Sequence, residues 1–194
     1  MRLPERRTAL LVACFFLSGA ASLMAQVVWL RYLALTFGNT TQAAATLLAV
    51  FMGGLGLGAF LFGRLADRWR RPLLAYAVLE ALIALFAFAS PALLRLIDQG
   101  YIAAYRGLLE GAPGLFVAAR VVLAAAVLLP PTLLMGGTLP LLLRGVTRRD
   151  VEVGRHTALF YALNTLGGAA GVALAGFVTI RLLGLHATLL LAAA

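Results

Sequence analysis

The stretch from Thr41 to Phe62 contains 22 consecutive residues without a charged side chain, and this feature constrains the fold most. Since an α-helix rises 1.5 Å per residue, about 20 apolar residues cover the roughly 30 Å hydrocarbon core of a bilayer. The decapeptide that follows, residues 63–72, carries four arginines and one aspartate and leads into another apolar run. The pattern predicts two membrane-spanning helices joined by a short charged loop.

The composition agrees with a membrane protein. Hydrophobic residues make up 63 % of the chain, charged residues 12 %, and the mean hydropathy is +0.99. A soluble domain has close to half apolar and about a quarter charged residues. All sixteen basic residues are arginine and lie mainly in short loops, so the net charge of +9 indicates membrane orientation rather than nucleic-acid binding. We predict a protein that is not an enzyme and binds no nucleic acid.

Five apolar runs are long enough to cross a bilayer, at residues 8–37, 41–62, 73–94, 116–143 and 157–180. A sixth run, from Leu182 to Ala194, covers about 20 Å as a helix and is shorter than the hydrocarbon core. We therefore predict an all-α membrane protein of about six helices whose last helix is short or truncated. It forms one domain, with a first repeat at 1–96, an outer interfacial loop at 97–115 that could contain a short helix, and an incomplete second repeat at 116–194.

The arginines predict the orientation in the membrane. They concentrate at the amino terminus and in the loops near residues 63–72 and 144–155, and these segments alternate with loops of little net charge. By the positive-inside rule, the amino terminus and both arginine-rich loops are cytoplasmic. Residues 1–25 resemble a signal peptide, but the apolar character continues to Leu30, so we predict an uncleaved first span.

The chain shows an internal repeat at an offset of 113 residues, which aligns Gly54, Gly58 and Gly63 with Gly167, Gly171 and Gly176. Three spans separate the copies, so the copies enter the membrane from opposite sides and form a three-plus-three inverted repeat. A chance alignment of common glycines is the alternative. Small residues four apart let helices approach closely, which predicts helix packing at Gly54, Gly58, Gly167 and Gly171.

Glu80 is the most informative single residue, because it lies about 10 Å inside the third span, where an unpaired carboxylate is costly. Asn164 lies equally deep in the fifth span with Tyr161 on its face, Tyr76 shares the face of Glu80, and Gln26 lies on the first span. These five residues form the predicted substrate-binding set. An interhelical hydrogen bond and a cation or proton site remain alternative interpretations of Glu80.

Two further patterns bear on chemistry. Pro130, Pro131 and Pro140 interrupt the fourth span and predict either a kinked helix or a broken helix that exposes carbonyl groups. The two histidines are far apart and lack a third ligand, so we predict no metal and no cofactor.

The loop at residues 63–71 resembles the signature loop between helices 2 and 3 of the major facilitator superfamily. Arg70 stands where that family usually has glycine. The matching positions are Gly63, Leu65, Asp67, Arg68 and Arg71. Four further stretches resemble the membrane part of bacterial fused major-facilitator/spermidine synthase proteins, at residues 27–31 together with 37–41, 51–54, 131–140 and 161–167.

This resemblance implies a six-helix, half-transporter-like bundle of the bacterial inner membrane. The soluble synthase domain is not in these residues, so we expect no aminopropyltransferase activity of this chain. One hypothesis is a half-transporter that forms a homodimer, or pairs with a second six-helix half, to move a small cationic solute such as a polyamine. The other is a non-transporting scaffold or anchor for an aminopropyltransferase domain.

Overall fold

A computed structural model describes residues 5–38, 40–104, 113–147 and 150–194, and these are helical except at short connections. Five helices in this part of the chain are long and apolar enough to cross a membrane. Large apolar side chains such as Leu35, Phe88 and Phe177 are exposed on the outside of the bundle, where a bilayer would cover them. The predictions of an all-helical fold and of five helices long enough to span a membrane are confirmed for these residues. The helices are α1 (Glu5–Phe37), α2 (Thr41–Ala66), α3 (Pro72–Ala104), α4 (Pro113–Val146), α5 (Asp150–Ala173) and α6 (Ile180–Ala193), with a π-helical segment η2 (Leu174–Thr179) between the last two.

Local sequence explains where the helices begin. Thr40 caps α2, because its hydroxyl oxygen accepts a hydrogen bond of 3.1 Å from the main-chain nitrogen of Ala43. Gly38 just before it has a φ of 88°, which a residue without a β-carbon adopts at little cost. Both α3 and α4 begin with a proline. Proline lacks a backbone N–H, and this costs nothing at the first position of a helix, where an N–H would have no acceptor within the helix.

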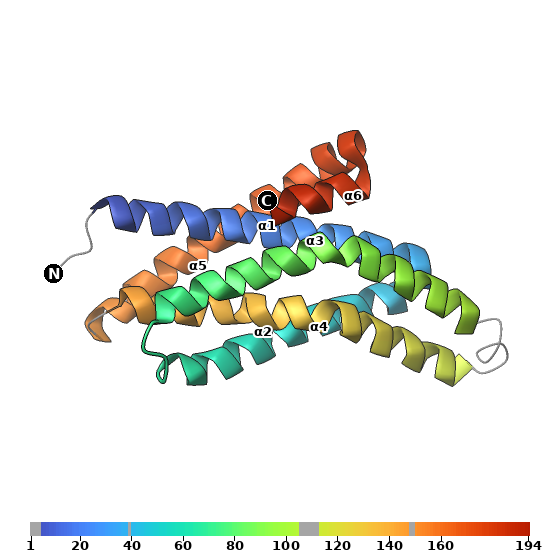
Figure 1. Ribbon diagram of the computed structural model, residues 1–194, viewed down its shortest axis with the longest axis horizontal. Coiled ribbons are helices and arrows are strands. Elements are labelled where there is room, and N and C mark those ends of the chain that lie inside the picture. Colours follow the sequence, from blue (N-terminus) through green and yellow to red (C-terminus); the bar gives the residue numbers. More distant parts are fainter. Residues whose placement is uncertain (1–4, 39, 105–112, 148–149) are drawn as a thin grey trace.

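Helices α1 to α4 run alternately in opposite directions, so the connections fall at two ends of the bundle (Figure 1). The start of α1, the α2–α3 loop, the end of α4 and the start of α5 share one end, which we call the arginine-rich end. Helix α2 packs along α4 and α5 packs along α1, while α3 lies against α4. The end of the chain returns over α1 and α3.

Glycines bring α2 and α4 into close contact. A β-carbon at Gly58 would collide with the main-chain carbonyl of Leu133, and one at Gly54 would collide with the side chain of Thr132. Such contacts require small residues, because any side chain would separate the helices.

The contact between α5 and α1 has the same character. A β-carbon at Gly171 would collide with the main-chain carbonyl of Ala20, and one at Gly167 with that of Phe16. Thus all four glycines predicted to pack lie at buried helix interfaces.

Helix α3 is longer than predicted. The third span was predicted to end at Leu94, with an interfacial loop from residue 97, yet the helix continues to Ala104. Leu94 and Tyr101 are buried and Ile97 packs against the same core, so this segment keeps one apolar face. The polar residues between them belong to the exposed face of a helix. The rest of the predicted loop, at 105–112, lies outside the described residues.

The end of the chain also differs from the prediction. The fifth span was predicted to stop at Ile180, but the helix continues through η2 into α6. The direction of the chain changes at Gly184, which has a φ of 79° and a ψ of 174°. A residue other than glycine adopts such a φ only with strain, so the backbone breaks there rather than at Arg181. The short segment after Gly184 does not form a sixth spanning helix and packs on α1, α3 and η2.

Helix α4 is continuous across its three prolines, so it is not a broken helix. Near Pro131, the Thr132 hydroxyl donates to the main-chain carbonyl of Leu128 at 2.6 Å, within the preceding turn.

The predicted orientation can be tested by labelling single cysteines after Cys14→Ala. Gln42 is exposed near the start of α2, and Arg70 is exposed in the loop that follows the other end of this helix. In intact cells we expect a thiol probe that cannot cross the membrane to label the Gln42→Cys variant, and the Arg70→Cys variant only after permeabilisation. The reverse pattern would place the arginine-rich end outside.

Candidate functional site

The polar centre of the bundle forms around Glu80, eight residues from the start of α3, or about 12 Å along its axis. The Ser18 hydroxyl on α1 donates a hydrogen bond of 2.7 Å to Glu80 Oε1. Tyr76, one turn earlier on α3, is buried, and its side chain interacts with this carboxylate. The Ser18 bond therefore links α1 to α3, and the Tyr76 hydroxyl adds a second polar group beside the carboxylate.

Aromatic side chains surround this centre. The ring of Phe15 packs against Tyr76, with ring centroids 6.2 Å apart, and against Phe160 of α5 at 5.9 Å. All three rings are buried. Water therefore has little access from this side, and a charge on Glu80 is poorly solvated.

Glu80 has no basic partner within 4 Å among the residues that the structure describes. The one ion pair in this part of the chain joins Arg144, near the end of α4, to Asp67 at the end of α2. Among the described residues the carboxylate accepts its side-chain hydrogen bond from the Ser18 hydroxyl. A half-buried carboxylate in an apolar span without a counter-charge is rare and marks a candidate cation or proton site.

Asn164 lies against the neighbouring position on α1. A β-carbon at Gly19 would approach Asn164 Oδ1 at 2.8 Å, and Gly19 follows Ser18, the partner of Glu80. The absence of a side chain at Gly19 is what lets α5 bring an amide this close to α1. The structure thus brings Glu80 and Asn164 to adjacent residues of one helix, with α1 as the link between them.

Two predicted site residues lie apart from this cluster. Tyr161 is 62 % exposed, because a spacing of three residues turns it about 60° away from Asn164 around α5, toward the outside. Gln26 is buried on α1, eight residues or about 12 Å beyond Ser18. The described contacts therefore reduce the site to Glu80, Tyr76 and Asn164, and add Ser18.

The predicted loop motif holds the ends of three helices together. Asp67 caps α2 and its Oδ1 lies 3.2 Å from Arg144 Nε at the end of α4. The Arg68 main-chain nitrogen donates to Leu65 O, and the Arg71 carbonyl accepts from Leu74 and Ala75 at the start of α3. Gly63 has open space around it. Both side chains of the ion pair are largely exposed, so it contributes little to stability.

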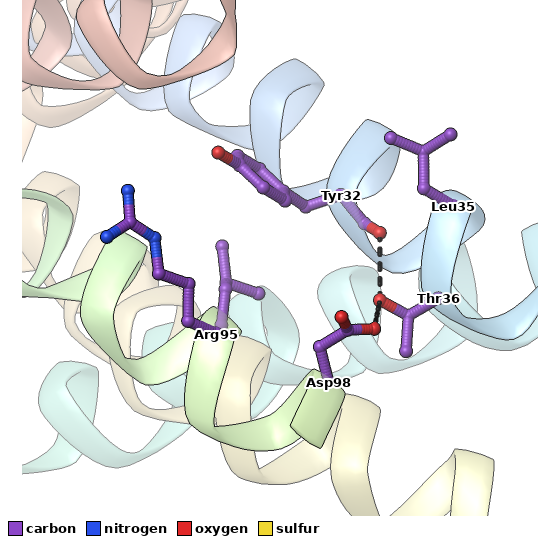
Figure 2. A pocket seen from close by; sticks show the side chains of 6 residues that line it. Tyr32, Leu35, Thr36, Arg95 and Asp98 are labelled. Carbon is purple, nitrogen blue, oxygen red and sulfur yellow. Dashed lines mark hydrogen bonds between the residues drawn. The ribbon is translucent and has the colours of Figure 1, made fainter. Parts of the chain in front are cut away.

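A second polar group at the opposite end of the bundle went unnoticed in the sequence. It borders an open pocket of about 250 Å³ between α1 and α3 (Figure 2). Asp98 falls within the predicted outer loop and Arg95 just before it, but their spacing of three places them on one face once this segment is helical. The lining residues are Tyr32, Leu35, Thr36, Leu94, Arg95 and Asp98.

The described residues contain no group of three or more His, Cys, Asp or Glu side chains that could hold a metal ion. Comparison of the chain with family models, with curated proteins and with solved structures found no match. Functional interpretation therefore depends on the geometry of the two polar sites.

Proposed function

We propose that this chain is a half-transporter-like membrane protein that binds a small cationic solute at Glu80. The observation that carries the proposal is a carboxylate within an apolar span that accepts a hydrogen bond from the Ser18 hydroxyl, lies near Tyr76, and lacks a basic partner among the described residues. An ammonium group at Glu80 would supply the missing counter-charge. The hydroxyls of Ser18 and Tyr76 can each accept as well as donate, so they could also receive N–H bonds from the ligand.

The proposed inverted repeat supports a half-transporter. Gly58 meets the carbonyl of Leu133, and Gly171 meets that of Ala20. An offset of 113 residues maps Gly58 onto Gly171 and Ala20 onto Leu133. The two glycines therefore correspond to each other, and so do the two residues whose carbonyl groups they meet. We infer that the α2–α4 and α5–α1 contacts are equivalent contacts between the two halves of an inverted repeat, the architecture that transporters place around a central binding site.

A complete cavity then requires a second half. In this proposal the chain forms a homodimer in the inner membrane, or pairs with another six-helix protein, and the solute is a polyamine, as the resemblance to the fused synthase proteins implies. The alternative is a scaffold for an aminopropyltransferase domain. In that case the bond from Ser18 to Glu80 only holds α1 against α3.

The Glu80→Gln variant separates these two functions, because it keeps shape and hydrogen bonding while removing the charge. Spermidine at ten times its dissociation constant is expected to stabilise the parent by about 1.4 kcal/mol, a rise in melting temperature of roughly 3–6 °C. The variant should stay folded in detergent and lose this rise. Asp67→Asn is the matched control, since it removes one exposed carboxylate at the loop and should retain the response.

The scaffold interpretation gives the opposite result. Spermidine would then leave the melting temperature of the parent unchanged at millimolar concentration. Equal responses of the parent and the Glu80→Gln variant would show that polyamine binds elsewhere on the protein.

A further inference from the structure

The pocket between α1 and α3 lies at the end of the bundle opposite the arginine-rich loops. Figure 2 shows Tyr32 and Thr36 of α1 facing Arg95 and Asp98 of α3, with the guanidinium group of Arg95 on one side and the carboxylate of Asp98 on the other. Its floor includes Leu94. The pocket therefore offers one cationic and one anionic group to the same ligand.

These two charges are available because they do not neutralise each other. Among the described residues the ion pair between Arg144 and Asp67 is the only one within 4 Å, so Arg95 and Asp98 stay apart although they lie one turn apart on α3. The Thr36 hydroxyl donates to Asp98 Oδ1 at 3.0 Å and fixes the carboxylate. The second carboxylate oxygen of Asp98 lies on the pocket side (Figure 2).

The depth of the pocket matches the boundary between hydrocarbon and head groups. The apolar stretch of α3 ends at Leu94, and Arg95 follows directly. Leu35 beside the pocket is 76 % exposed and Leu96 is 66 % exposed, so apolar surface continues from the polar groups toward the outside of the bundle. A ligand with a charged head and apolar chains would match both surfaces.

We propose that this pocket binds a zwitterionic phosphate–ammonium head group, as carried by phosphatidylethanolamine. The guanidinium of Arg95 matches two oxygens of the phosphate, and the primary ammonium donates to the free oxygen of Asp98. The Tyr32 hydroxyl, which borders the same pocket, can donate a further hydrogen bond to the phosphate. This site does not involve Glu80 and is independent of the function proposed above.

The head-group preference of the parent protein tests the proposal without any substitution. Native mass spectrometry in detergent would compare three lipids with the same acyl chains. Phosphatidylethanolamine is expected to bind at least about tenfold more tightly than phosphatidylglycerol, which lacks the ammonium, or phosphatidylcholine, whose ammonium has no N–H to donate. Equal binding of the three lipids would overturn the proposal.

Single substitutions test which part of the head group Arg95 and Asp98 each bind. Arg95→Gln should weaken binding of both phosphatidylethanolamine and phosphatidylglycerol at least about tenfold, because both present a phosphate. Asp98→Asn should abolish only the preference for phosphatidylethanolamine. Arg31→Gln is the matched control, since Arg31 is exposed on α1 next to Tyr32 but does not line the pocket, and its binding should match the parent. A loss in the control equal to that of Arg95→Gln would indicate nonspecific attraction and refute the assigned site.

The same measurement with soluble phosphoethanolamine identifies the source of the head group. We expect it to displace the lipid only at concentrations at least about tenfold higher, because it lacks the chains that Leu35 and Leu96 would contact. Displacement at equal concentration supports the head-group chemistry and assigns the pocket to a soluble ligand.

Discussion

Leucine at Gly58 is expected to lower the free energy of unfolding of the bundle by about 1–3 kcal/mol, the usual cost of overpacking. A side chain there would collide with the main-chain carbonyl of Leu133. A side chain in the way could rotate aside, but a helical carbonyl is held by its own helix, so α2 and α4 must separate. Their separation removes packing along the most extensive helix pair of the fold.

Thermal unfolding in detergent would measure this effect, with Gly56→Leu as the matched control. Gly56 lies on the same helix with nothing near its β-carbon position, so its substitution should have little effect. Gly171→Leu is expected to be as destabilising as Gly58→Leu, because Gly171 meets the carbonyl of Ala20 in the same way. Unchanged stability of the Gly58 and Gly171 variants would show that these contacts are not tight.

The spans could be predicted because their signal comes from solvent preference rather than tertiary contacts. A run such as residues 41–62 has no alternative to a helix in a bilayer, and the structure has α2 at Thr41–Ala66. Proline at Pro72 and the charges around Asp67 set the boundaries of α2 and α3 locally. Sequence therefore defined which segments are helical and roughly where they end.

Other features depended on how a helix packs once it has formed. The extension of α3 to Ala104 follows from burial of Leu94 and Tyr101, which the average polarity of that segment conceals. The change of direction at Gly184 was overlooked because many glycines in this chain serve packing instead. Sequence alone does not distinguish a glycine with positive φ from a glycine at a helix interface.

The polar centre was predicted only in part, because its membership also depends on how the helices pack. Depth along the helix pointed to Glu80 and Asn164, but depth says nothing about rotation around the axis, so Tyr161 was included although it faces outward. Ser18 was missed because a single hydroxyl is common in apolar spans. Its role depends on its position opposite Glu80, a residue 62 positions away in the sequence.

Trp29→Ala is expected to be the most damaging truncation in the core. Trp29 is fully buried on α1, its ring meets the edge of Phe86 with centroids 5.9 Å apart, and its Nε1 donates to Ser90 Oγ at 2.9 Å. Truncating tryptophan in soluble cores costs about 3–5 kcal/mol. In a membrane, lipid chains already give the unfolded state an apolar environment. Moving the tryptophan ring out of water therefore contributes less to the free energy of unfolding than in a soluble protein, whereas the packing contacts are still lost. We therefore expect a loss of about 2–3 kcal/mol.

Trp29→Phe separates packing from the hydrogen bond. Phenylalanine keeps most of the ring volume and removes only the N–H, and Ser90 still donates to the carbonyl of Ala87 at 2.8 Å. Interhelical hydrogen bonds in membranes average about 0.6 kcal/mol, so thermal unfolding should show a loss near that value plus a small packing cost. Ser90→Ala leaves the Nε1 donor buried without a partner and should cost more than Trp29→Phe. If Trp29→Phe proves as damaging as Trp29→Ala, then the bond to Ser90, rather than the volume of the ring, holds α1 against α3.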